Sequence, residues 1–302
     1  MAVMKPANSL SPRMGNKPTF SAALTGNAMQ ALIAKSMPDK GTAARFTATL
    51  LSVVSASEQL KACEPTSIVT AALRGESMNL IYGHGYYITP YGDQATFVLG
   101  YKGMIQLAMA SGAYNDIDCI EIREGEKKGR DPRTGKVQID LSVYDDDAVR
   151  ESKPIIGYYA YYELKDGMFR YEYWPMEKLL KHAERYSPAF SMEKYQKLVS
   201  GELPENEVKK LSKSSPWYDA YGQDRMCRKT VIRQLLNSGY APLSNETQRV
   251  LDNDAKEESG ETGTGIIVDN VSVIPDTAEK PAETKAQVLD SFFDAPPAGE
   301  GN

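Results

Sequence analysis

Four basic side chains recur at helical intervals in the last third of the sequence. Arg225, Arg228, Lys229 and Arg233 are separated by three or four residues, and Asp224 stands beside them. Residues at these separations are neighbours on a helix, which rises ~6 Å per four residues, close to the phosphate spacing of a single strand. The stripe therefore suits a row of phosphates, although a solvated charged face has the same pattern.

These side chains need a helix, and the flanking residues predict one from Ser215 to Gly239. Ser215 is a natural N-cap, Pro216 suits the first helical position, and Gly239 can end the helix in the left-handed conformation. The same segment carries a separate apolar stripe for packing on a core, formed by Val231, Ile232, Leu235 and Leu236.

A second candidate anion site is the segment Gly100-Tyr-Lys-Gly103. It follows two β-rich runs between Tyr86 and Leu99, which predict a hairpin around a Gly-Asp turn, and it precedes a short helix that ends at Gly112. Backbone N–H groups at such a helix start favour an anion, and Lys102 adds a full charge. A tight turn with an exposed lysine explains the same four residues.

The remaining pattern predicts an α+β fold, in which an antiparallel sheet has flanking helices that form a basic groove. Helices are expected first, strands in the middle and helices again at the end. Lys165-Asp-Gly167 is a turn of the kind that joins antiparallel strands. The expected helices are 42–63, 65–78 and a segment after Pro175, and the expected strands are 117–124, 137–143, 156–164 and 168–174.

Charge is distributed unevenly along the 302 residues. Residues 251–302 carry twelve acidic and three basic residues, so this segment has a net charge of −9, and residues 1–250 are left at +4 within a total of −5. The composition predicts a flexible arm over 1–40, a core over 41–250 and a disordered acidic tail over 251–302. A basic core indicates a polyanionic partner.

Several classes of function lack their residues. Cys63, Cys119 and Cys227 are far apart and suggest neither a disulfide framework nor a zinc site, and two histidines are too few for a histidine-rich metal centre. The chain has no signal peptide and no run approaching the ~18 apolar residues of a membrane span, so we expect a cytoplasmic protein.

No Gly-x-x-x-x-Gly-Lys-Ser/Thr loop is found, which argues against an ATP-driven enzyme. The run Asp145-Asp-Asp147 leaves open a metal-dependent nuclease that binds Mg²⁺, although adjacent carboxylates usually mark a solvated loop. Binding without catalysis, and so without a cofactor, is the interpretation that these residues favour.

Four short motifs, in order, resemble the RecT family of phage and prophage single-strand annealing proteins. The likeness covers about Leu50 to Tyr240. The motifs are Gly100-Tyr-Lys-Gly103, Ile122-Arg-Glu-Gly-Glu126, His182-Ala-Glu-Arg-Tyr-Ser187, and Trp217 with Asp219 and the run from Met226 to Leu235.

The resemblance implies a non-catalytic protein that binds single-stranded DNA and anneals it to a complementary strand without ATP. It also implies a homo-oligomeric ring or filament, a partner exonuclease, a C-terminal contact with the host single-strand-binding protein, and at most a modulatory role for Mg²⁺. A generic nucleic-acid-binding phage protein remains the other alternative. The candidate DNA contacts are Tyr101, Lys102, Arg123, Arg185, Arg225, Arg228, Lys229 and Arg233.

Overall fold

The computed structural model describes residues 19–258, and side chains are described as far as Asn253. These residues form two compact units. The first comprises residues 19–70 and 90–95, and the second comprises residues 71–89 and 96–258. The core predicted for residues 41–250 therefore contributes to both units.

The first unit is built from short helices that pack around α3. Its helices are α1 (Phe20–Leu24), α2 (Asn27–Ser36), α3 (Lys40–Ser55), α4 (Glu58–Ala62) and the beginning of α5 (Pro65–Ser77). Helices α1 and α2 lie in the segment that composition predicts as a flexible arm. They contact α3 because Leu24 and Ile33 bury their side chains almost completely. Asp39 caps α3 by accepting from the Thr42 backbone N–H at 2.9 Å, and the single helix predicted over 42–63 is divided between α3 and α4.

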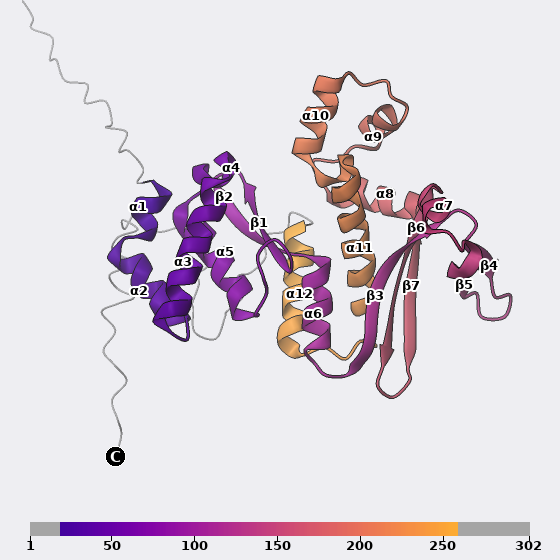
Figure 1. Ribbon diagram of the computed structural model, residues 1–302, viewed down its shortest axis with the longest axis horizontal. Helices are drawn as coiled ribbons and strands as arrows, with labels where there is room; N and C mark the ends of the chain where they lie inside the picture. The colour runs from indigo at the N-terminus through magenta and orange to yellow at the C-terminus, as the bar shows by residue number, and fades with distance from the viewer. Residues whose placement is uncertain (1–18, 259–302) are drawn as a thin grey trace, which may run out of the picture. The chain divides into compact units, whose positions relative to one another are not determined.

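The chain enters the second unit within α5, and this unit holds the main sheet (Figure 1). Its strands are β1 (Tyr86–Tyr91), β2 (Gln94–Leu99), β3 (Tyr114–Arg123), β4 (Lys127–Arg130), β5 (Val137–Ile139), β6 (Ile155–Leu164) and β7 (Phe169–Pro175), the first two being shared with the first unit. Its helices are α6 (Tyr101–Met109), α7 (Asp147–Glu151), α8 (Met176–Tyr186), α9 (Met192–Val199), α10 (Glu205–Ser214), α11 (Ala220–Leu236) and α12 (Asn245–Glu258).

The main sheet has the order β3-β6-β7, and both pairings are antiparallel. Alternation along β6 directs Tyr158, Ala160 and Tyr162 to one buried face, while Tyr159 and Tyr161 stay half-exposed on the other. Helix α11 covers the buried face and runs beside β3 (Figure 1). The predicted α+β fold with an antiparallel sheet and flanking helices is confirmed.

Helix α11 begins later than the sequence predicts. A short 3₁₀ turn, η2 (Pro216–Tyr218), follows Ser215, and Asp219 is the true N-cap, accepting from the Gly222 N–H at 2.8 Å. The turn folds back over the first residues of the helix. It lies so close that a Cβ at Gly222 would be 2.6 Å from the Pro216 carbonyl oxygen, so glycine is required there. The predicted apolar stripe is buried, with Val231 and Ile232 at 0% exposure.

The predicted strand over 137–143 is too long. Only β5 forms there, pairing with β4, and a 3₁₀ turn, η1 (Leu141–Val143), follows it. The Asp140 carboxylate accepts from the Ser142 N–H at 3.0 Å and so fixes this turn instead of a longer strand.

Helix α12 closes the described part of the chain. Ser244 caps it by accepting from the Thr247 N–H at 3.0 Å, and Val250 and Leu251 are buried. The predicted boundary between core and tail at 250/251 falls inside this helix, and residues 259–302 lie outside the described residues. In the described part of the chain, every helix is too short or too polar to cross a bilayer.

Candidate nucleic-acid interface

The segment Gly100-Tyr-Lys-Gly103 forms the first turn of α6, and both of its glycines support a close backbone contact. The Gly100 N–H donates to the Gly85 carbonyl oxygen at 2.9 Å. A Cβ at Gly103 would lie 2.1 Å from the same oxygen, so the loop around Gly85 rests directly on the helix. Within the described residues, no side chain caps α6, which leaves its first N–H groups available to an anion.

Tyr101, at this helix start, lies beside the first half of α11, which contacts α6. Burial raises the pKa of the Tyr101 hydroxyl, and the nearby positive charges of Arg228 and Arg225 oppose that rise. Lys102 is exposed. The structure therefore brings Tyr101 of α6 close to Arg225 of α11, as an interface formed by both segments requires.

Two further tyrosines complete this group of side chains. The guanidinium of Arg225 donates to the Tyr87 hydroxyl at 3.1 Å and lies over the Tyr221 ring at 4.0 Å from its centroid. Tyr221 is 64% exposed. We call Tyr87, Tyr101, Lys102, Tyr221 and Arg225 the α6–α11 cluster. Cations beside exposed aromatic rings are the chemistry that binds single-stranded nucleic acid.

Tyr87 and Tyr221 were missing from the residues predicted from the sequence. Tyr221 stands four residues before Arg225, a spacing that places the two side chains next to each other on a helix. That spacing could have identified Tyr221. Nothing near Tyr87 in the sequence indicates its contact with a residue 138 positions away.

Arg228 points to an internal set of charges instead. Its Nε donates to the Asp224 carboxylate at 2.9 Å, and its other nitrogens donate to the Cys119 carbonyl oxygen and to the Glu121 carboxylate. Burial opposes the charge of this guanidinium, but the hydrogen bond and charge of Asp224 outweigh it and raise the pKa of Arg228. Arg228 thereby ties α11 to β3.

The same internal set continues to α7. The Glu126 carboxylate is fully buried, and it accepts from Arg150 Nε at 2.5 Å and from the Arg123 backbone N–H at 2.7 Å. Arg150 Nη1 also lies 3.1 Å from Glu121 Oε1. We call Glu121, Arg123, Glu126, Arg150 and Arg228 the β3 charge network. Each charge in it faces an opposite charge, as partly buried ionic groups require.

Arg123 also has internal partners. Its Nη1 donates to the Glu151 and Lys153 carbonyl oxygens, both at 2.8 Å, and its side chain is 14% exposed. The motif Ile122-Arg-Glu-Gly-Glu126 thus positions a turn and a loop in this structure. Its arginine joins strand β3 to the segment after α7.

The other candidate contacts lie elsewhere. Lys229 and Arg233 belong to the buried side of α11, at 4% and 6% exposure. Arg185 is exposed on α8, where its guanidinium lies 5.1 Å from the Tyr186 ring centroid. Of the predicted stripe on α11, Arg225 is thus the member that joins the α6–α11 cluster.

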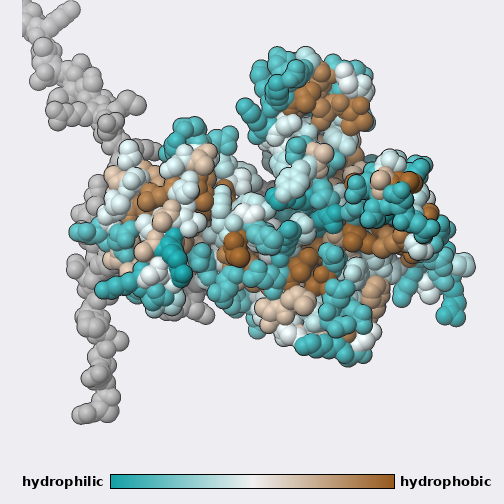
Figure 2. Space-filling model, viewed as in Figure 1, coloured by the Kyte–Doolittle hydropathy of each residue, from teal (hydrophilic) through white to brown (hydrophobic). Residues whose placement is uncertain are grey.

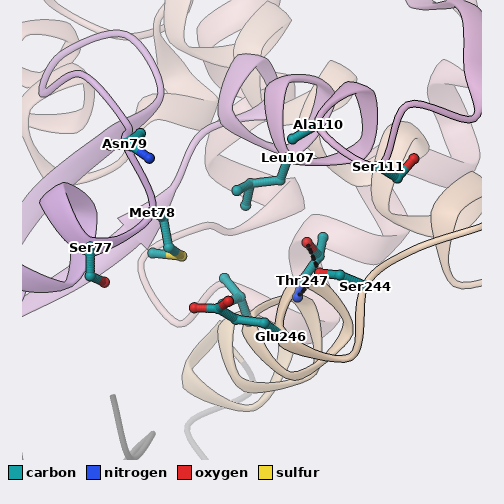
Figure 3. A pocket seen from close by; sticks show the side chains of 10 residues that line it. Ser77, Met78, Asn79, Leu107, Ala110, Ser111, Ser244, Glu246 and Thr247 are labelled. Atoms are coloured by element: carbon teal, nitrogen blue, oxygen red, sulfur yellow. Dashed lines mark hydrogen bonds between the residues drawn. The ribbon is translucent and has the colours of Figure 1, made fainter. Parts of the chain in front are cut away.

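Other sites in the described chain offer less. A pocket of about 210 Å³ lies between α6 and α12, where the Ser244 and Thr247 hydroxyls meet at 2.8 Å (Figure 3). Its lining includes Glu246 and no basic residue, so it does not suit a phosphate. Asp146 caps α7, and the described residues contain no group of three potential metal ligands.

Cys119 of β3 and Cys227 of α11 are buried in the interior of the second unit, and both thiols are free. Burial raises the pKa of each thiol, and it is the largest influence on both pKa values. Protonated, buried thiols of this kind are unreactive while the structure stays closed.

Stability is expected to depend on pH through Glu121. Burial favours its protonated form, but hydrogen bonds from its own backbone and from Arg150, together with the charge of Arg228, lower the pKa. Its contribution is therefore complete above the unfolded pKa of about 4.3 and is lost as pH falls through the folded value. We expect the free energy of unfolding, measured with urea between pH 6 and pH 3, to fall less in Glu121→Gln than in the unaltered protein. Equal slopes would contradict this role.

Comparison with known proteins adds an independent observation. The sequence profile of the RecT family matches residues 44–264. The uncharacterized protein YqaK of Bacillus subtilis (strain 168) is 34% identical over 263 residues, which cover 84% of this chain and 80% of that protein. Protein RecT of Escherichia coli (strain K12) is 25% identical over 241 residues, which cover 76% and 77% of the two chains.

Proposed function

The chain belongs to the RecT family, and we propose that it anneals complementary DNA strands without ATP, using the α6–α11 cluster to hold one strand. Membership of this family implies single-strand annealing in recombination. The observation that supports the site is the position of Arg225, which contacts Tyr87 and Tyr221 and lies near Tyr101 at the uncapped start of α6. In this proposal Lys102, Arg225 and the first N–H groups of α6 bind phosphates.

Annealing constrains how the strand is held. The backbone must be fixed while the edges of the bases stay free to pair, so contacts to phosphate are needed and contacts that read bases are not. Tyr101 and Tyr221 offer ring surfaces that support bases of any sequence. Low sequence preference and strong dependence on salt follow from these contacts.

A few phosphate contacts per subunit bind weakly, so we propose that the protein acts as a homo-oligomeric ring or filament. Subunits repeated along one strand combine their contacts, which raises the overall affinity. We place this assembly in the cytoplasm of a bacterial or phage-infected cell. An exonuclease would expose the strand, and the acidic segment beyond Glu258 would contact the host single-strand-binding protein. No cofactor is needed, and Mg²⁺ would at most modulate binding.

Arg225→Ala tests the site. We expect the affinity for a fluorescent single-stranded oligonucleotide to fall roughly three- to tenfold, and the salt slope of binding to decrease by about 0.7 for the lost phosphate contact. The annealing rate of complementary oligonucleotides should fall with it. Lys210→Ala is the matched control, because Lys210 is an exposed cation of α10. Equal affinity in Arg225→Ala and Lys210→Ala would contradict the site.

The assay also separates the proposed function from its alternatives. Annealing in a buffer with a chelator and without ATP, with both oligonucleotides kept at full length, is the expected result. Shortened oligonucleotides that appear only with Mg²⁺, and that disappear in Asp147→Ala, would favour a nuclease. Binding that does not accelerate pairing would favour a generic nucleic-acid-binding protein.

A further inference from the structure

The hairpin formed by β4 and β5 carries an exposed basic surface outside the α6–α11 cluster. It presents five exposed cations, which are Lys127, Lys128, Arg130, Arg133 and Lys136. Figure 2 shows hydrophilic surface over this hairpin, at the right of the view. No motif in the sequence assigns it a function.

The hairpin has a high net positive charge for its length. Five basic and two acidic residues give residues 127–140 a net charge of +3, compared with +4 for the whole of residues 1–250. The two acidic residues, Asp131 and Asp140, accept hydrogen bonds within their own turns, from the Thr134 N–H at 2.7 Å and the Ser142 hydroxyl at 2.7 Å. Among the described residues, Lys128, Arg133 and Lys136 form no close ion pair or side-chain hydrogen bond, and the carboxylates of Asp140 and Asp131 interact with the side chains of Lys128 and Lys136 only through their charges.

The hairpin reaches the face of the sheet opposite α11. Lys127 Nζ lies 5.4 Å from the centroid of the Tyr173 ring, and Tyr173 pairs with Tyr159 on the half-exposed face. On the other face, the Tyr158 hydroxyl donates to Asp224 of α11 at 3.0 Å. The hairpin and the α6–α11 cluster are thus two cationic surfaces associated with opposite faces of one sheet.

The half-exposed face itself is poorly suited to nucleic acid. Tyr159 stacks on Tyr171 with ring centroids 5.0 Å apart, and Tyr161 stacks on Phe169 with ring centroids 5.8 Å apart. Ring surfaces that could receive bases therefore already cover one another. Asp116 accepts from the Tyr161 hydroxyl at 2.9 Å and adds a negative charge. Of the tyrosine face and the hairpin, the hairpin is therefore the part that suits a polyanion.

We propose that the β4–β5 hairpin is a second phosphate-binding surface, which captures the backbone of the complementary strand before pairing. This inference rests on the proposed annealing function. Two backbones repel each other, and a protein that brings them together needs counter-charge for each. A strand held loosely on the hairpin is also at high effective concentration for pairing with the strand on the α6–α11 cluster.

The test uses protein saturated with one unlabelled oligothymidine, to which a labelled, non-complementary oligonucleotide is added so that pairing cannot contribute. We expect the triple variant Lys128→Gln/Arg133→Gln/Lys136→Gln to bind the first strand normally. Its affinity for the second strand should be roughly tenfold lower, with a salt slope reduced by about two for three lost contacts. The annealing rate at low strand concentration should fall in parallel.

The matched control is Lys194→Gln/Lys210→Gln/Lys213→Gln, which removes the same charge from exposed positions of α9 and α10. It should bind the second strand as the unaltered protein does. An equal loss of second-strand affinity in both triple variants would show that only the net charge of the protein matters, and would overturn the proposal. A hairpin variant that loses first-strand affinity as strongly as second-strand affinity would also overturn it, by placing the hairpin in the first site. Failure of the unaltered protein to anneal would instead refute the proposed function.

Discussion

Arg228→Ala is expected to lower the free energy of unfolding by up to about 3 kcal/mol, the lower end of the range for a buried ion pair, because the side chains involved are only partly buried. The substitution removes the guanidinium that joins Asp224 of α11 to Glu121 of β3, so Asp224 loses its cationic partner while Glu121 keeps Arg150. It also leaves the Cys119 carbonyl oxygen without the hydrogen bond from this side chain. Urea unfolding followed by circular dichroism measures the change.

Arg225→Ala is the control for this experiment, because it removes the same kind of side chain from the same helix. Arg225 bonds to tyrosine hydroxyls and lies outside the β3 charge network, so its loss should cost about 1 kcal/mol or less. The two substitutions should thus have different effects, since Arg228 contributes mainly to stability and Arg225 mainly to DNA affinity. An Arg228→Ala protein of normal stability that no longer binds DNA would contradict this division and return Arg228 to the nucleic-acid interface.

Gly103→Ala is expected to destabilise the protein by at least about 2 kcal/mol, near the upper range for overpacking after the gain in helix propensity is subtracted. The new methyl group would lie 2.1 Å from the Gly85 carbonyl oxygen and 2.9 Å from the Leu99 side chain. Neither backbone nor buried core yields easily, so the loop or the start of α6 must move. DNA affinity should fall as well, because α6 positions Tyr101 and Lys102.

Thermal and urea unfolding of Gly103→Ala should be compared with those of Lys102→Ala. Lys102 is exposed on the same turn, and its replacement should change stability by less than about 0.5 kcal/mol. Gly103→Ala with unchanged stability would show that the contact between Gly103 and Gly85 is looser than the structure indicates.

The sequence was most informative where one local pattern determines one element. The strand predicted over 156–164 corresponds to β6, and Lys165-Asp-Gly167 predicted the turn to β7, where Gly167 adopts a φ of +84°. Ser215 was predicted as the N-cap of this helix, and cap propensity alone does not reveal the short turn that precedes the helix. The close contact of Gly222 with Pro216, which follows from packing, makes Asp219 the cap of α11.

The candidate site was only partly predictable for a related reason. The spacing of Arg225, Arg228, Lys229 and Arg233 predicts a shared stripe, but spacing carries no information about which part of the helix lies under other elements. The partner that separates Arg228 from Arg225 is Glu121, more than a hundred residues away in the sequence. Short motifs identified the family correctly, whereas the role of each arginine depends on partners that only the folded chain brings together.

The pair of buried thiols makes the motion of α11 accessible to measurement. Cys227 lies on this helix and Cys119 on the strand beneath it, so a thiol reagent reaches either sulfur only after the helix separates from the sheet. With Cys63 of the first unit replaced by Ala, so that these two are the remaining thiols, the modification rate reports the fraction of time that this layer is open. A bound strand that holds α6 and α11 together would slow that rate. The rate would then measure how often the interface opens with and without DNA.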